Sequence, residues 1–311
     1  MNHVCESYTM KKMMECVPNF SEGRDLGRVE RIAASFRGKE GVKLLNCERD
    51  ADHNRMVVTV VGEPDPLGDA VVAAVGMAIE VIDMRQHTGQ HPRMGAVDVI
   101  PFIPVRDVTM EDAILLSKKV AKAVWESYSL PVFLYEASTD DPVRKDLANI
   151  RKGQFEGMSE KIKLHMWRPD FGEAQIHPTA GVVAIGARMP LIAFNVNLDT
   201  DNIEIANAIA NAVRHISGGL RYCKAIGIAL KERNITQVSM NMTDYKKTPL
   251  YRVVELIRIE AKRYGVNVVG SEIIGLTPMG ALVDAAAYYM GLEDFSVEKV
   301  LEARISAPER F

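Results

Sequence analysis

Apolar and polar residues alternate along this chain with two periods that predict the same order of elements twice. A period of two, or a short apolar run, indicates a strand, and a period of 3.6 indicates a helix. The first half predicts strands and helices in the order 13–17, 25–37 (helix), 43–48, 55–62, 67–84 (helix) and 97–104. The second half predicts 190–197, 201–214 (helix), 224–230, 235–242, 249–263 (helix) and 266–274. The predicted fold class is therefore α/β (α+β), with two ferredoxin-like βαββαβ subdomains.

Each predicted subdomain is followed by one more helix. Thr109 and Asp112 have the spacing of a capping box, and Thr277 is the expected N-cap before Pro278 in the first turn of the other helix. Between the subdomains, residues 136–189 are rich in Pro, Gly and charge, and we expect them to be irregular. The predicted division is a mobile N-terminal extension at 1–12, a first subdomain at 13–180 and a second at 181–311.

Composition excludes several classes of protein. The chain has 311 residues, of which 47% are hydrophobic and 25% charged, as in ordinary globular domains. Its formal net charge is −3, which argues against a nucleic-acid partner. No signal segment and no run of about 18 apolar residues is present, so we expect neither export nor a membrane partner. The 4 cysteines show no metal-binding spacing, and reduced thiols favour a cytoplasmic location.

Three polar loops of the first subdomain are expected to meet. They are "PNFSEGRD" (18–25), "ERDADHN" (48–54) and "RQHTGQHPRMG" (85–95). In a split β-α-β unit the first two strands run one way and the next two the other way, so these loops leave the sheet at one end. A carboxylate and an imidazole with basic neighbours at a cleft are suited to proton transfer. The residues brought together would be His91, Glu48, Asn19, Ser21, Asn54, Arg55 and Arg93.

Each of these residues also has a purely structural interpretation. His91 would then be a capped or solvated loop residue, and Arg55 a surface residue at the start of a strand. Ser21 with Glu22 would cap the first helix, and Asn54 would close the hairpin through its own side chain. These alternatives are open at the level of the sequence.

The pair His87 and His91 suggests a metal site, but the sequence argues against one. Gly89 interrupts the helical geometry that would aim both rings at one ion, and no third ligand is visible. His87 is instead expected to be exposed at the end of a helix, where its charged form suits the helix dipole. We therefore predict no metal.

Five longer motifs carry a family resemblance. They are "ECVPNFSEGR" (15–24), "IDMRQHTGQHPRMGAVDVIPFIPV" (82–105), "WRPDFG" (167–172), "GARMPLIAFNVNL" (186–198) and "VVGSEIIGLTPMGALVDAA" (268–286). With these motifs the sequence resembles the glutamate formiminotransferases, the folate-dependent enzymes of histidine degradation. The resemblance spans the chain from about residue 13. It implies a homodimeric α/β enzyme with folate in a cleft between its two subdomains.

The resemblance also implies roles for particular residues. The "HPRMG" motif places the catalytic histidine at His91. Counting back from "NR" at 54–55 places the assisting carboxylate at Glu48, where animal members have Asp. The sequence ends at Phe311 with nothing like a cyclodeaminase domain, so a separate cyclodeaminase is expected to act downstream. The implied folate-contacting loop is Gly172, Glu173, Ala174, Gln175, Ile176, His177, Pro178, Thr179, Ala180 and Gly181.

The expected reaction moves a formimino group from N-formiminoglutamate to tetrahydrofolate, the co-substrate, through a tetrahedral carbon. One base must become an acid, and an imidazole with an ordinary pKa of about 6.5 suits this role. Arg93 and Arg188 are candidates for holding substrate carboxylates. The alternatives are formiminoglycine or N-formylglutamate as donor, or a non-catalytic module that binds folate or an amino acid. An RNA-binding protein is disfavoured, because no aromatic RNP1-like run is present.

Overall fold

The computed structural model describes residues 12–89 and 91–306, and the chain divides into two compact units between Arg188 and Met189. Each unit has its own hydrophobic core. Apart from Lys12, the predicted extension at 1–12 lies outside the described residues. The predicted cleft between the units stays a prediction.

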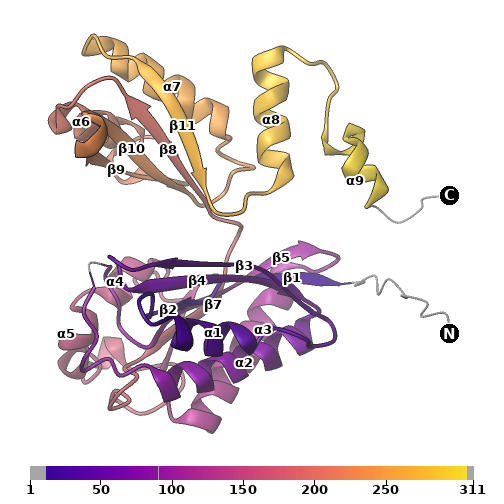
Figure 1. The fold of residues 1–311 in the computed structure, drawn as a ribbon, viewed down its shortest axis with the longest axis vertical. Coiled ribbons are helices and arrows are strands. Elements are labelled where there is room, and N and C mark those ends of the chain that lie inside the picture. The colour runs from indigo at the N-terminus through magenta and orange to yellow at the C-terminus, as the bar shows by residue number, and fades with distance from the viewer. Residues whose placement is uncertain (1–11, 90, 307–311) are drawn as a thin grey trace. The chain divides into compact units, whose positions relative to one another are not determined.

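Unit 1 is built on one mixed sheet of seven strands (Figure 1). Its strands are β1 (Met13–Cys16), β2 (Asn19–Phe20), β3 (Val42–Asp50), β4 (Arg55–Gly62), β5 (Val97–Arg106), β6 (Val132–Glu136) and β7 (Val183–Ala187). Its α-helices are α1 (Leu26–Ala34), α2 (Pro64–Val81), α3 (Met110–Tyr128), α4 (Leu147–Arg151) and α5 (Gln154–Lys161), followed by the 3-10 turn η1 (His165–Trp167).

The strand order in this sheet is β1-β4-β2-β5-β7-β6, with β3 paired antiparallel to β4. Helices α1, α2 and α3 lie together on one side of the sheet and share its main core (Figure 1). Residues of α4 and α5, including Ile150 and Met158, join a second cluster with Phe133 and Val182. As predicted, Thr109 and Asp112 form a complete capping box at the start of α3.

The segment 136–189, predicted to be irregular, contains the two helices α4 and α5 and the strand β7. β7 pairs in parallel with both β5 and β6, so the chain stays within unit 1 until Arg188. The boundary in the structure therefore lies after residue 188 and not at the predicted residue 180, because burying this strand extends the sheet beyond the ferredoxin-like order.

Unit 2 has the predicted βαββαβ order. Its elements are β8 (Ile192–Leu198), α6 (Ile203–Val213), η2 (His215–Ser217), β9 (Cys223–Leu230), η3 (Lys231–Arg233), β10 (Ile235–Met242), α7 (Leu250–Arg263), β11 (Val268–Ile274), α8 (Met279–Met290), η4 (Val297–Lys299) and α9 (Leu301–Ile305). The four strands are antiparallel in the order β11-β8-β10-β9. Helix α8 has Pro278 as its N-cap, and Thr277, the predicted cap, instead has a buried hydroxyl without a hydrogen-bond partner.

Two further observations concern the described residues as a whole. No helix within 12–89 and 91–306 combines the length and the apolar character that crossing a membrane requires. Cys16, Cys47 and Cys223 carry free thiols. Neither observation specifies a compartment, so the cytoplasmic location stays a prediction.

Candidate active site

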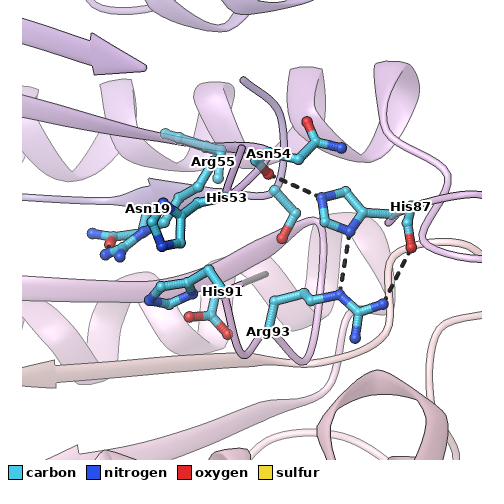
Figure 2. A pocket seen from close by; sticks show the side chains of 10 residues that line it. Asn19, His53, Asn54, Arg55, His87, His91 and Arg93 are labelled. Atoms are coloured by element: carbon cyan, nitrogen blue, oxygen red, sulfur yellow. Dashed lines mark hydrogen bonds between the residues drawn. The ribbon is translucent and has the colours of Figure 1, made fainter. Parts of the chain in front are cut away.

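The three polar loops of unit 1 meet at one end of its sheet, as predicted, and they line a pocket (Figure 2). Its empty volume is about 200 Å³, including the part open to solvent. The lining residues are Asn19, Phe20, Ser21, His53, Asn54, Arg55, His87, His91, Arg93 and Asp98.

Asn54 joins all three loops. Its backbone has a φ of 49°, a left-handed conformation that Asn tolerates better than most residues. Its side-chain Oδ1 accepts from the backbone N–H of Gly23 at 3.0 Å, and its Nδ2 donates to the carbonyl of Thr88 at 3.0 Å. The side chain therefore does more than close its own hairpin, because it fixes the distance between the loops that form the pocket.

Two glycines allow these loops to approach each other at the backbone. A Cβ at Gly89 would lie 2.3 Å from the carbonyl oxygen of His53. A Cβ at Gly23 would lie 2.3 Å from the carbonyl oxygen of Asp50. Any larger residue at either position would therefore push its loop away from the hairpin.

His87 connects the loops and is half-buried, unlike the exposed residue that we predicted. Its Nε2 lies 3.0 Å from the carbonyl oxygen of Asn54, and its Nδ1 accepts from Nε of Arg93 at 3.2 Å. Because a carbonyl can only accept, these contacts define a neutral ring that carries its proton on Nε2. Burial lowers the pKa of His87, which favours the same neutral form.

Arg93 is buried and uses all of its donors within the protein. Nη1 donates to Gln154 at 3.1 Å and to Glu156 at 2.8 Å, and Nη2 donates to Glu156 at 2.6 Å and to the carbonyl of His87 at 3.2 Å. With Nε bound to His87, the five N–H groups of the guanidinium are occupied. In this structure Arg93 therefore ties its loop to α5, and no donor is left for the substrate carboxylate that the sequence suggested.

His91 lies half-buried in the pocket wall. Burial, followed by the nearby charges of Arg55 and Arg151, lowers the pKa of His91 to about 3. The ring is therefore neutral near pH 7 and is able to accept a proton.

Arg55 supplies an unsatisfied donor beside His91. The residue begins β4, and its Nη2 donates to Oδ1 of Asn19. Its Nε is buried without a hydrogen-bond partner, and burial lowers the pKa of Arg55 to about 10. A buried N–H without a partner costs about 1–3 kcal/mol, so an anionic group bound here would be stabilised. These observations suit a ligand carboxylate.

Asp98 and Arg151 complete the charged surroundings of the pocket, and sequence reasoning missed both. Oδ1 of Asp98 accepts from the backbone N–H of Met94 at 3.0 Å, and Oδ2 accepts from Nε of Arg151 at 2.9 Å. The available signal was the single carboxylate within the apolar run "VDVIPFIP", because a buried charge requires a partner. Arg151 belongs to the segment predicted to be irregular.

Comparison with known proteins decides the family. Residues 13–188 match the formiminotransferase domain, N-terminal subdomain, and residues 193–306 match the formiminotransferase domain. The chain belongs to the formiminotransferase family. This confirms the resemblance seen in the motifs, and the protein is a transferase enzyme of this type.

The formiminotransferase is similar to single-function and bifunctional relatives. It is 52% identical to the glutamate formimidoyltransferase of Streptococcus pyogenes serotype M1, over 93% of this chain and 97% of that protein. Its identity to the glutamate formimidoyltransferase of Thermoplasma acidophilum is 48%, over 94% and 97% of the two chains. It is also 40% identical to the formimidoyltransferase-cyclodeaminase of Rattus norvegicus, over 93% of this chain and 54% of that protein.

Glu48 of this formiminotransferase is not among the pocket residues. It is exposed on β3, where its Oε1 accepts from Nδ2 of Asn46 at 2.7 Å. Asp50, two positions later, lies opposite Arg55 in the strand register and binds the pocket residue His53. Neither carboxylate lines the pocket, but Asp50 binds a residue that does.

Asn19 and Ser21 line the pocket as predicted, but their side chains also bind the backbone. Nδ2 of Asn19 donates to the carbonyl of Val17 at 2.8 Å, and the hydroxyl of Ser21 donates to the carbonyl of Gly95 at 2.8 Å. The N-cap of α1 is Asp25 and not Ser21. Both predicted residues thus shape the wall, and the hydroxyl oxygen of Ser21 keeps the capacity to accept.

The predicted folate loop, Gly172–Gly181, lies outside this pocket. Nδ1 of His177 accepts from the backbone N–H groups of Thr179 at 3.3 Å and Ala180 at 3.0 Å, which closes a compact turn. The carbonyl of Ala180 accepts from the N–H of Ala96, so the turn packs behind the segment that carries the pocket. Residues 173–175 are exposed.

Two predictions from the sequence remain, the role of Arg188 and the absence of a metal. Arg188 does not line the pocket, and its backbone N–H donates to the carbonyl of Phe102 at 3.0 Å. Among residues 12–89 and 91–306, no group of three or more His, Cys, Asp or Glu is arranged to hold a metal ion. The metal-free reaction stays a prediction.

Proposed function

We propose that this formiminotransferase moves the formimino group of N-formiminoglutamate to N5 of tetrahydrofolate, giving 5-formiminotetrahydrofolate and glutamate. This is the formimino step of histidine degradation. The family supports the type of transfer, and the names of the two relatives that are 52% and 48% identical support the donor. The observation that carries the proposal is the neutral imidazole of His91 in the same pocket as the unpaired Nε of Arg55.

The reaction requires two proton transfers. A bond forms between N5 and the amidine carbon, and the bond from that carbon to the glutamate nitrogen breaks. N5 must lose a proton, and the departing nitrogen must gain one, because an amide-like anion is a poor leaving group. His91 accepts the first proton and, in the simplest scheme, returns it to the leaving group.

Arg55 adjusts the basicity of His91. In the protein without ligand, the charge of Arg55 contributes to the low pKa of His91, second to burial. A carboxylate of the donor bound at Nε of Arg55 would offset that charge and raise the pKa of His91 toward neutral pH. Binding of the donor would thus make the imidazole a stronger base at the moment when it is needed.

Other parts of the proposal rest on the family and not on the pocket. We keep the loop Gly172–Gly181 and Arg188 as proposed folate contacts, and Glu48 as a proposed partner of the cationic amidine. We also propose a cytoplasmic homodimer that acts on small molecules, with no nucleic-acid or membrane partner. Its product would pass to a cyclodeaminase, a reaction class that the name of the rat relative also carries.

A spectrophotometric assay tests the function. The purified protein is mixed with tetrahydrofolate and, in turn, with formiminoglutamate, formiminoglycine and N-formylglutamate. We expect the highest kcat/KM with formiminoglutamate. A preference for another donor would change the proposed substrate but not the proposed type of transfer. Binding of folate without turnover of any donor would indicate a non-catalytic module.

A further inference from the structure

A second histidine, His53, lies in the pocket beside His91. The centroids of the two rings are 6.2 Å apart, and their planes are inclined by 70°. Figure 2 shows these two rings near each other on one side of the pocket, while His87 and Arg93 occupy the other side. His53 comes from the hairpin between β3 and β4, and sequence reasoning overlooked it.

Asp50 holds His53 in place. Its Oδ1 accepts from the backbone N–H groups of Asp52 and His53, each at 2.9 Å, and its Oδ2 lies 2.6 Å from Nδ1 of the His53 ring. The hydrogen bonds from His53 lower the pKa of Asp50, so the carboxylate is ionised near pH 7. An ionised carboxylate can only accept, and Nδ1 of His53 therefore carries a proton.

The charges around the two histidines differ in sign. The carboxylate of Asp50 lies against the ring of His53, whereas Arg55 and Arg151 disfavour a proton on His91. Because the two rings are close, a charge on His53 further disfavours a charge on His91. Enzymes can separate an acid from a base by placing two titratable groups beside charges of opposite sign.

We propose that His53 is the general acid of the transfer reaction and that His91 is its base. This inference deepens the proposed function and rests on it. His91 takes the proton from N5, and the imidazolium of His53 donates its Nε2 proton to the glutamate nitrogen as the bond from that nitrogen to the amidine carbon breaks. Asp50 is a positioning residue, which holds Nδ1 of His53 so that Nε2 is left for the substrate.

The proton balance closes through solvent. After one turnover His91 holds the proton from N5, and His53 has lost one. The side chain of His53 is 46% exposed, so water can protonate it again, while His91 releases its proton to solvent after the product leaves. No oxidant, metal or other reactant is needed.

Donors with different leaving groups test this division. We compare wild type, His53→Gln and His91→Ala on formiminoglutamate and on an aryl donor, the formimidate ester of 4-hydroxybenzoate, whose aryl oxygen departs as a phenolate without protonation. His53→Gln should lose about a hundredfold in kcat on formiminoglutamate, the low end for loss of a general acid, and less than about fivefold on the aryl donor. His91→Ala should lose activity on both donors. The matched control is His165→Gln, an exposed histidine of the same unit outside the pocket, which should change neither rate.

A second measurement does not depend on the aryl donor. The groups that surround His53 and His91 are Asp50, Arg55, Arg151 and Asp98. With formiminoglutamate, the alkaline limb of the wild-type kcat profile should disappear in His53→Gln and persist in His165→Gln. Asp50→Asn should keep its fold, as measured by circular dichroism, and should lose less activity than His53→Gln. Like His53→Gln, it should lose more activity on formiminoglutamate than on the aryl donor.

The results that overturn the proposal are distinct from those that overturn the function. An unchanged rate and pH profile in His53→Gln, or an equal loss on both donors, would show that His53 is not the acid. Failure of the wild type to use formiminoglutamate would instead contradict the proposed function. The same variants would then be compared on the donor of the panel that the wild type does use.

Discussion

Nε of Arg93 donates to Nδ1 of His87 over 3.2 Å, and this contact links α5, through Arg93, to the hairpin that His87 binds. The guanidinium is thus part of the scaffold beneath the pocket. Arg93 lies within the motif "HPRMG", close to His91, and the sequence therefore suggested that it binds a substrate carboxylate. Because all of its donors are used within the protein, we expect any effect of Arg93 on catalysis to be indirect.

Replacement of Arg93 by Met should therefore lower stability more than donor selectivity. We expect the free energy of unfolding to fall by about 2 kcal/mol, because several charge-assisted hydrogen bonds are lost. Urea denaturation measures this change. The control is Arg85→Met, whose ion pair with Asp83 is open to solvent and should contribute little to stability. A large change in donor selectivity with unchanged stability would contradict this role of Arg93.

Replacement of His91 by Ala should abolish most of the turnover and leave folate binding intact. The expected loss in kcat is about 10² to 10⁴, the usual range for a general base. Calorimetry with folate and a steady-state assay separate the two effects. A variant with nearly wild-type kcat would remove His91 from the mechanism.

The low pKa of His91 predicts the direction in which stability changes with pH. In the unfolded chain its pKa is about 6.5, and in the folded protein it is about 3, so the unfolded state binds the proton more tightly. His91 therefore lowers stability progressively as pH falls from about 6.5 to about 3. In the free enzyme, the NMR signals of this ring should not titrate between pH 5 and 8. Arg55→Met should move the titration upward, and an ordinary titration near pH 6.5 in wild type would be inconsistent with the structure.

Arg55 should also set the choice of donor. Formiminoglutamate carries a propionate arm that formiminoglycine lacks, and a buried carboxylate requires a partner. We expect kcat/KM to favour formiminoglutamate by at least about a hundredfold, or about 2.7 kcal/mol. Arg55→Met should reduce that ratio more than it changes the rate with formiminoglycine. Arg188→Met is the comparison, and a greater effect there would transfer the carboxylate contact to Arg188.

The topology of the first subdomain could be predicted because loops at one end of a sheet follow from strand directions alone. That reasoning placed His91, Asn19, Asn54 and Arg55 together, and the pocket confirms it. The hydrogen-bond partners of the side chains were harder to predict from the sequence. The sequence does not show that five acceptor atoms surround Arg93, since three of them belong to Gln154 and Glu156 of α5, two helices and two strands further along the chain.

Glu48 shows a second limit of prediction from the sequence. The strand β3 has a register irregularity between Leu44 and Asn46, and such a shift changes how positions relate to the neighbouring strand. The hairpin sequence "ERDADHN" offers several carboxylates, and the turn geometry selects Asp50 as the partner of His53. His53 is the third histidine in the three loops that were expected to meet, beside His87 and His91. Its presence there was the signal that could have identified it.

The close contact at Gly89 has a consequence for the changes in loop length that this chain can tolerate. Because a Cβ at residue 89 would collide with the carbonyl oxygen of His53, the loop that carries His91 and the hairpin that carries His53 pack without an intervening side chain. An insertion or deletion in one loop would separate the two imidazoles unless the other loop changed length as well. The two segments, far apart in sequence, can thus change length only together.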